Sequence, residues 1–294
     1  MTAAPHHNPT QTATETLTVV PLRHPWRWVG AAVIVYFLLS VADLLITNDR
    51  WHWHIVGQYL FSKPILKGVL ATIILTILAE VIGMTLGIIL AVMRLSENPL
   101  LRWTSATFTW FFRGIPHLVI VLFIYFFSAL VPMLAIGIPF GPSWEIVETN
   151  KVITQMVAAA VGLGLAQAAY VAEIVRSGIL SVSGGQTNAA LALGMTPMQT
   201  MRHIIFPQAM RVIVPPLANE VIAMVKATSL VSAIAYMELL TTVQVIYARN
   251  FEQIPMLMVA VIWYAAITTV LTLAQSQIEK RLNRSAKNNS GARK

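Results

Sequence analysis

The chain contains several long apolar stretches that carry almost no charge, and this feature limits what it can fold into. Of its 294 residues, 56% are apolar and 11% are charged, whereas soluble domains carry about 25% charged residues. Several stretches exceed the ~18 apolar residues that mark a transmembrane helix, and they lack the polar face that a soluble helix needs. The sequence therefore predicts an all-α membrane protein with about six spans. They are placed at 28–47, 66–93, within 103–133, 152–175, within 212–245, and 255–278.

The formal net charge of +8 comes from basic residues at the ends of these spans and in the C-terminal tail. Thirteen Lys and Arg lie at one set of ends, including six in the tail, and five lie at the other set. Cytoplasmic loops carry the excess of Lys and Arg, so both termini are predicted to be cytoplasmic. The same distribution argues against nucleic acid as a partner, because the charge flanks membrane spans.

The two ends of the chain and one outer segment differ from the spans in composition. Residues 1–25 are polar and are interpreted as a disordered cytoplasmic tail, and residues 279–294 as a basic cytoplasmic tail. Residues 26–64 are predicted to hold an additional N-terminal transmembrane helix and an outer loop. Residues 135–150 contain four Gly and Pro and predict a turn-rich outer loop, which either faces a partner or serves only as a connector.

One long segment on the predicted inner side, residues 176–207, shows the punctuation of helices. Residues 186–193 are rich in Ala and Leu and favour a helix, which Gly194 is suited to end. Thr196 is placed as the N-cap of a second helix, with Gln199 completing a capping box. Pro207 either ends that helix or begins the next element. A short, capped, apolar helix of this kind either docks onto another protein or lies flat on the membrane.

This segment resembles the EAA loop of the inner-membrane permease subunits of ABC importers. Residues 185–195 (GQTNAALALGM) and 207–209 (PQA) carry the resemblance. Residues 112–116 (FRGIP), 168–174 (AAYVAEI) and 226–232 (KATSLVS) are similar to the polar-amino-acid branch, which includes importers of the histidine, glutamine, arginine and cystine type. The resemblance covers about residue 67 to the C-terminus.

The resemblance implies a type I importer (MetI-like) permease fold with an extra N-terminal span. The permease core would occupy residues 65–278 and the coupling loop residues 183–207, which in that family docks into a cleft of the ATP-binding subunit. Asn188 stands where the family has a glutamate, so we expect docking by shape more than by charge. The residues assigned to ATPase coupling are Gly185, Gln186, Asn188, Ala189, Ala190, Leu193, Gly194 and Thr196.

The resemblance also implies the partners. They are a dimer of ABC ATPase subunits, a second permease subunit that is identical or homologous, and a solute-binding protein outside a bacterial inner membrane. The sequence has no phosphate-binding loop and no hydrolase or metal motif. The chain is therefore expected to be a transport subunit without an ATPase site or cofactor, with ATP and Mg²⁺ on the partner subunits.

Six charged residues lie inside or at the edges of the apolar spans, where a central charge costs about 2.5–3.5 kcal/mol. Glu173 and Arg176 are expected to form a local ion pair. Arg113 is expected to anchor or pair beside a helix break, and Glu238 to reach water at the outer end of its span. The remaining three are Glu80, Glu220 and Lys226.

Glu220 is the main candidate for contact with substrate, together with Asn219. Both follow Pro215 and Pro216, where the helix is expected to be disturbed and backbone groups face a cavity. A buried acid there can hold an ammonium group, and the resemblance implies substrate contact at Glu220. The alternative is a structural acid that is hydrogen-bonded between helices.

Glu80 is a second candidate of the same kind, although Gly83 and Gly87 after it indicate close helix packing. Lys226, Thr228 and Ser229 complete the predicted substrate-binding set. The two hydroxyl groups either satisfy backbone groups at a bend or shape a gate.

The predicted function is the translocation path for polar amino acids in an ATP-driven importer. The alternative is an ATP-independent channel or secondary transporter of small polar solutes. That class predicts internal repeats with paired broken helices, and no convincing repeat relates the two halves. A membrane scaffold would carry no buried charge, and several are present here.

Overall fold

The computed structural model of the chain describes residues 25–138 and 141–291. The predicted tail at residues 1–25 lies outside these ranges except for Pro25. The chain divides into two compact units, with the boundary between Trp51 and His52, and each unit is described by itself.

The first unit holds one long helix, α1 (Pro25–Thr47), followed by the short 3₁₀ helix η1 (Asp49–Trp51). Residues Trp26–Thr47 are long and apolar enough to cross a membrane, which confirms the predicted span at 28–47. Its apolar side chains are exposed around the helix, and a helix that is apolar on every side belongs in lipid. The indole of Trp51 donates to the carbonyl oxygen of Leu44 over 3.0 Å.

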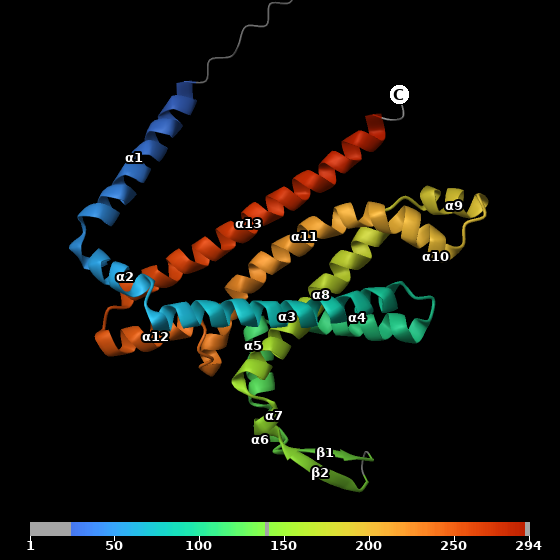
Figure 1. Cartoon of the computed structure of the whole chain (residues 1–294), viewed down its shortest axis with the longest axis horizontal. Coiled ribbons are helices and arrows are strands. Elements are labelled where there is room, and N and C mark those ends of the chain that lie inside the picture. Colours follow the sequence, from blue (N-terminus) through green and yellow to red (C-terminus); the bar gives the residue numbers. More distant parts are fainter. Residues whose placement is uncertain (1–24, 139–140, 292–294) are drawn as a thin grey trace, which may run out of the picture. The chain divides into compact units, whose positions relative to one another are not determined.

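The second unit is a helical assembly with one small β-hairpin (Figure 1). Four of its helical stretches are long and apolar enough to cross a membrane, and the bent pair of helices α4 and α5 is apolar enough to be either a broken fifth span or a re-entrant loop. The multi-pass, mostly helical fold is therefore as predicted. The bounds of its helices are α2 (Trp53–Leu60), α3 (Lys63–Leu95), α4 (Pro99–Gly114), α5 (His117–Tyr125), α6 (Phe127–Leu130), α7 (Thr149–Val152), α8 (Gln155–Leu180), α9 (Gly184–Ala192), α10 (Pro197–Thr200), the π-helix η2 (Met201–Ile205), α11 (Phe206–Ala227), the 3₁₀ helix η3 (Thr228–Ile234), α12 (Leu239–Asn250) and α13 (Gln253–Gly291).

The third predicted span, within 103–133, is not one straight helix. It is split into α4 and α5, which meet at an angle of 101°. The break falls at Ile115 and Pro116, between the end of α4 at Gly114 and the start of α5 at His117. A proline disfavours the helical conformation of the residue before it, which is Ile115 here. The sequence predicted a helix break at this point.

The fifth predicted span, within 212–245, is present and interrupted, as the stretch Pro197–Ile234 followed by α12, but the disturbance expected at Pro215 and Pro216 was wrong. The helix is not disturbed at Pro215 and Pro216, because α11 runs through both to Ala227. Two adjacent prolines remove two helix hydrogen bonds, but α11 packs against α8, α13 and α3, and these contacts hold it helical. The interruption lies further on. The chain continues as η3, takes a left-handed turn at Ala235 with φ 54°, and begins the separate helix α12.

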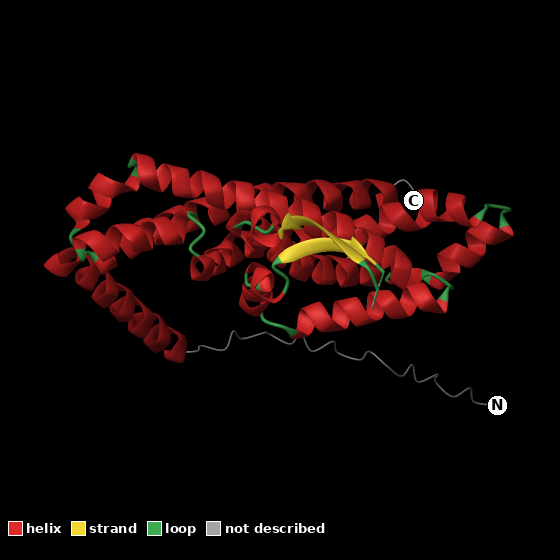
Figure 2. Cartoon of the chain, turned by 90° about the horizontal axis from the view of Figure 1, so that it is seen from below, coloured by secondary structure: helices red, strands yellow, loops and turns green. Residues whose placement is uncertain are grey.

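The predicted loop at 135–150 is an antiparallel β-hairpin over most of its length (Figure 2). Its strands are β1 (Met133–Gly137) and β2 (Ser143–Glu148), with Ile136 paired to Trp144. The glycines and prolines correctly predicted a turn. The alternation of apolar and polar residues on either side of it is typical of strands, and the prediction of a loop overlooked it.

Helices α3 and α8 make the most extensive contact in the unit. Glycines in both helices allow this approach. A Cβ atom added at Gly83 would lie 2.5 Å from Cγ of Gln167, and one at Gly164 would lie 2.7 Å from Cγ2 of Ile82. At Gly87 it would lie 2.5 Å from Cβ of Val171. The close packing indicated by the Gly83 and Gly87 spacing is therefore present, and the main core cluster forms around it from α3, α5, α8, α11 and η3.

Glu238 does not reach water as expected, because it is fully buried at the N-terminus of α12. Its Oε1 accepts hydrogen bonds from the backbone N–H and the hydroxyl of Thr241, at 2.7 and 3.1 Å. Its Oε2 accepts from the hydroxyl of Tyr264 at 2.7 Å and of Thr72 at 3.3 Å. The Thr72 hydroxyl in turn accepts from the backbone N–H of Leu239. One carboxyl group thereby joins α3, α12 and α13.

We expect Glu238→Ala to lower the free energy of unfolding by roughly 2–5 kcal/mol, because it leaves several buried donors without an acceptor. Thermal unfolding in detergent, followed by circular dichroism, measures this. Glu238→Gln keeps one acceptor oxygen and should lose less. Glu97→Ala, at an exposed position, should change stability by less than about 0.5 kcal/mol. Equal midpoints for the Glu238 and Glu97 variants would contradict this role.

Candidate functional site

The loop between α8 and α11 has the predicted order of helix, glycine turn and helix. Helix α9 ends at Ala192, and Gly194 follows with φ 81°, a conformation that favours glycine. The hydroxyl of Thr196 accepts from the N–H of Gln199, and the side chain of Gln199 accepts from the N–H of Thr196 at 2.8 Å. This reciprocal capping box confirms the predicted start of α10.

The chain does not leave the helical path at Pro207. Residues Pro197–Ile234 form one continuous helical stretch, in which α10 passes through η2 into α11. Pro207 is the second residue of α11, which directly follows the π-helix η2, so the change of helix type coincides with the missing N–H of the proline. Of the two alternatives, Pro207 therefore sits at the beginning of the next element, and α10 is joined to α11 without a flexible link.

Most of the residues assigned to coupling lie on the surface of the loop. Ala190 is buried in α9, the helix that packs against α10 and η2. Apolar side chains are presented outward, since Leu193 is 83% and Met198 75% exposed. The exposed coupling residues are Gly185, Gln186, Asn188, Ala189, Leu193, Gly194 and Thr196.

A polar cluster lies between α3, α8 and α11. Glu80 is 8% exposed, and its Oε1 accepts a hydrogen bond from Nε2 of Gln167 at 3.1 Å. Its Oε2 is buried and has no hydrogen-bond partner among the described residues. Glu220 of α11 is half-buried and lies near enough to Glu80 for the two carboxyl groups to interact electrostatically. The structure thus places the two acids that the sequence singled out within electrostatic range of each other.

Gln167 was missed by the sequence analysis. It lies in α8 between Gly164 and Val171, two residues of the contact with α3, and it is 2% exposed. A glutamine inside an otherwise apolar span is a signal in its own right, because a buried amide needs a partner. That signal was available from the sequence.

The other predicted substrate residues lie elsewhere. Asn219 faces α13, where its Oδ1 accepts from Nε2 of Gln275 at 3.0 Å. The hydroxyls of Thr228 and Ser229 donate to the carbonyl oxygens of Val225 and Lys226, each over 2.7 Å. They therefore satisfy backbone groups where α11 gives way to η3. The side chain of Lys226 is exposed.

Charges near the loop are paired or stacked. Glu173 and Arg176 form the expected ion pair through two hydrogen bonds, at 2.5 and 3.1 Å. The guanidinium of Arg113 lies 5.6 Å from the centre of the Tyr170 ring, and the ring of His117 stacks on Tyr170 at 5.8 Å. Both ends of the break between α4 and α5 are thereby held against α8. Cation–π contacts of this kind contribute about 0.5–2 kcal/mol.

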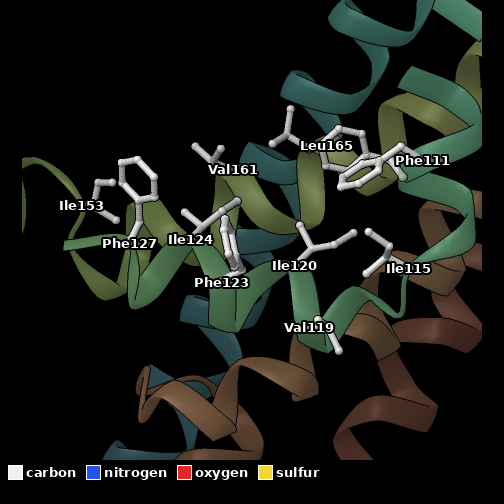
Figure 3. Close-up of a pocket in the computed structure, with 11 residues that line it drawn as sticks. Phe111, Ile115, Val119, Ile120, Phe123, Ile124, Phe127, Ile153, Val161 and Leu165 are labelled. Carbon is white, nitrogen blue, oxygen red and sulfur yellow. The ribbon is translucent and has the colours of Figure 1, made fainter. Parts of the chain in front are cut away.

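An apolar cavity of about 460 Å³ lies beside this break (Figure 3). Its lining comes from α4, α5 and α8, including Phe111, Ile120 and Leu165. It offers no hydrogen-bonding side chain, so a polar solute would lose its hydration there without compensation. In the described part of the chain, no group of three or more His, Cys, Asp or Glu is placed to hold a metal ion.

Comparison with known proteins agrees with this geometry. Residues 83–284 match the family described as binding-protein-dependent transport system inner membrane component. The chain belongs to this family. It is 42% identical over 265 residues to the arginine transport system permease protein ArgU of Corynebacterium glutamicum, covering 90% of this chain and 82% of that protein. It is 35% identical to the glutamate/aspartate import permease protein GltK of Escherichia coli, covering 74% of this chain and 92% of that protein.

A solved structure of an amino acid ABC transporter with histidines has a similar fold. The TM-score is 0.65 at 30% sequence identity, covering 77% of this chain and 98% of the other. The chain is thus a membrane-spanning permease subunit of an ABC amino-acid importer with the type I (MetI-like) fold. Permease subunits of this family lack an ATPase site, which lies on a separate subunit.

We expect Gly194→Ala to weaken the glycine turn by about 1 kcal/mol, because alanine is disfavoured at positive φ. The effect is one of conformation alone, since a Cβ atom at Gly194 would meet nothing within 4 Å. Substrate-stimulated ATP hydrolysis by the assembled importer should fall. Gly184→Ala is the matched control, because a Cβ atom there is also free of contacts and φ is not positive. Equal hydrolysis by the two variants would contradict this reading of the turn.

Proposed function

We propose that this permease subunit carries polar amino acids along a path beside Glu80 and Glu220, and that their carboxyl groups receive the ammonium group of the substrate. The observation that supports this most is the buried Oε2 of Glu80, which has no partner among the described residues although a second carboxyl group lies nearby. Buried polar atoms are usually hydrogen-bonded. Because this oxygen is shielded in the conformation described, the ammonium group of the substrate reaches it only when the helices around it move apart during transport.

The named substrates of the relatives fit this chemistry. Arginine, in the name of one relative, and glutamate or aspartate, in that of another, differ in the charge of the side chain. They share the α-ammonium group, which is the group that a carboxylate recognises by charge-assisted hydrogen bonds. Two carboxyl groups can also accept a basic side chain, as an arginine importer requires. We therefore propose polar amino acids, with the cationic ones favoured.

Coupling to ATP is proposed to run through the α9–α10 loop. The exposed Leu193 and Met198 give the loop an apolar surface for a cleft in the ATPase subunit. Because α10 continues into α11 without a flexible link, displacement of the loop displaces the helix that carries Glu220. Asn188 brings no charge to this contact, so the shape of the turn determines the fit.

The proposed assembly has two ATPase subunits on the cytoplasmic side, a second permease subunit of identical or homologous sequence, and a solute-binding protein outside. Both termini are proposed to be cytoplasmic, as the excess of Lys and Arg favours. ATP and Mg²⁺ are assigned to the ATPase subunits, since neither a phosphate-binding loop nor a metal motif occurs in this sequence.

We expect Glu220→Gln to reduce ATP-dependent uptake of radiolabelled arginine by about tenfold or more, because the loss of one charge-assisted hydrogen bond corresponds to about 1.5–3 kcal/mol. Uptake is measured in proteoliposomes that contain the importer and its binding protein. Glu148→Gln, in the exposed hairpin, is the matched control for loss of a carboxylate and should transport normally.

Two further measurements separate a substrate role from a structural one. Thermal unfolding of Glu220→Gln should match that of the unmodified chain, and basal ATP hydrolysis should persist while its stimulation by substrate is lost. If Glu220→Gln transports normally with unchanged selectivity, the proposed substrate contact is wrong. If uptake proceeds without ATP, the coupled mechanism is wrong and the channel or secondary transporter remains.

A further inference from the structure

The β-hairpin between α6 and α7 has one apolar and one polar face. Its pairing places Ile136 opposite Trp144 and Leu134 opposite Val147, and alternation along β1 puts these two pairs on the same face. A β-bulge between Leu134 and Ala135 leaves one residue of β2 unpaired. This extra residue allows Trp144 and Val147 to lie on the same face although they are three positions apart.

The other face carries the polar residues of the hairpin. Ala135 pairs with Glu145, Gly137 with Ser143, and Met133 with Glu148. Glu148 also forms an ion pair with Lys151 at 3.1 Å. Both carboxylates, Glu145 and Glu148, belong to β2 and therefore lie on the face away from the apolar pairs.

Leu134 and Val147 are partly buried, but the described residues of the chain leave the half of the apolar face that is nearer the turn uncovered. Ile136 is 68% and Trp144 69% exposed. An exposed apolar patch of this kind is unusual in water and indicates a surface that contacts a partner or a membrane.

Hydrogen bonds join the two ends of the hairpin to each other at its base. The N–H of Thr149 donates to the carbonyl oxygen of Pro132 at 2.9 Å, and its hydroxyl donates to that of Val131. Thr149 is fully buried. Because α5 ends at Tyr125 and α8 begins at Gln155, β1 begins eight residues after one membrane helix and β2 ends seven residues before the next. A five-residue strand spans only about 17 Å, so the apolar face stays close to the membrane boundary.

We propose that this hairpin lies on the membrane, with the face of Leu134, Ile136, Trp144 and Val147 in the lipid interface and the carboxylates in water. Tryptophan is enriched at membrane interfaces, and an amphipathic element lies in the plane of the interface with its apolar side inward. The lipid-facing surface also continues into the hairpin, since Phe126 and Leu130 just before it are 60% and 72% exposed. The hairpin thus holds the adjoining ends of α6 and α8 at the depth of the interface.

The absence of cysteine from the sequence makes the test direct. Single-cysteine variants Trp144→Cys and Glu145→Cys place an environment-sensitive fluorophore at neighbouring positions on opposite faces. The full chain is labelled, assembled with its ATPase and reconstituted in lipid nanodiscs. Ile136→Cys and Ala135→Cys are a second pair on the same two faces, in case Trp144→Cys does not fold.

We expect brominated lipid to quench the probe at position 144 about twofold or more over that at 145, and aqueous iodide to show the reverse order. Equal quenching at both positions would overturn the proposal. A probe at position 144 that neither brominated lipid nor iodide quenches would also overturn it, because that result indicates that protein covers this face. Shielding at 144 that occurs only after addition of the binding protein would also overturn it, and would assign this face to that partner.

Discussion

The close approach of α3 and α8 is the contact on which the rest of the second unit depends. Gly83, Gly87 and Gly164 leave no room for a side chain between the two helices. In a membrane, small residues of this kind drive association, because helix packing gains little from the hydrophobic effect there. The contact buries Ala79 and Leu163 in the main core cluster, and it brings Gln167 within hydrogen-bonding distance of Glu80. The same glycines thus set both the packing and the polar cluster.

The path from the coupling loop to this cluster is helical throughout. Helix α10 passes into α11, which carries Glu220, and Gly178 near the end of α8 lies directly against Ile213 of α11. In the proposed coupling, a movement of the loop is therefore transmitted to α8 and α11 together. Pro215 and Pro216 lie along this route and remove two helix hydrogen bonds. Helix α11 therefore bends more easily there, between the loop and Glu220.

Much of this arrangement was predictable from local sequence. Hydropathy predicts the spans, and a proline and a glycine predict the break at Pro116 and the turn at Gly194. The capping box at Thr196 is predictable because its hydrogen bonds join residues only three positions apart. The family resemblance came from the same loop, because its shape is encoded in a short segment.

The features that were missed depend on contacts between residues distant in sequence. Glu238 was placed in water because it lies at the end of a span, and its acceptor role requires Thr72 and Tyr264 from two other helices. The helix at Pro215 stays intact because α8, α13 and α3 support it. The position of Glu220 beside Glu80 likewise needs the packing of α11 on α3, which no pattern within α11 indicates.

The most direct test of the account is ATP-dependent amino-acid uptake by a Gly83→Val importer. A Cβ atom at this position would lie 2.5 Å from Cγ of Gln167, so the new side chain displaces the hydrogen-bond partner of Glu80 and pushes α3 away from α8, while the sequence of the α9–α10 loop is left unchanged. The account predicts that the ATPase subunit still co-purifies with the chain and that uptake is lost. Undiminished uptake by this variant would contradict it.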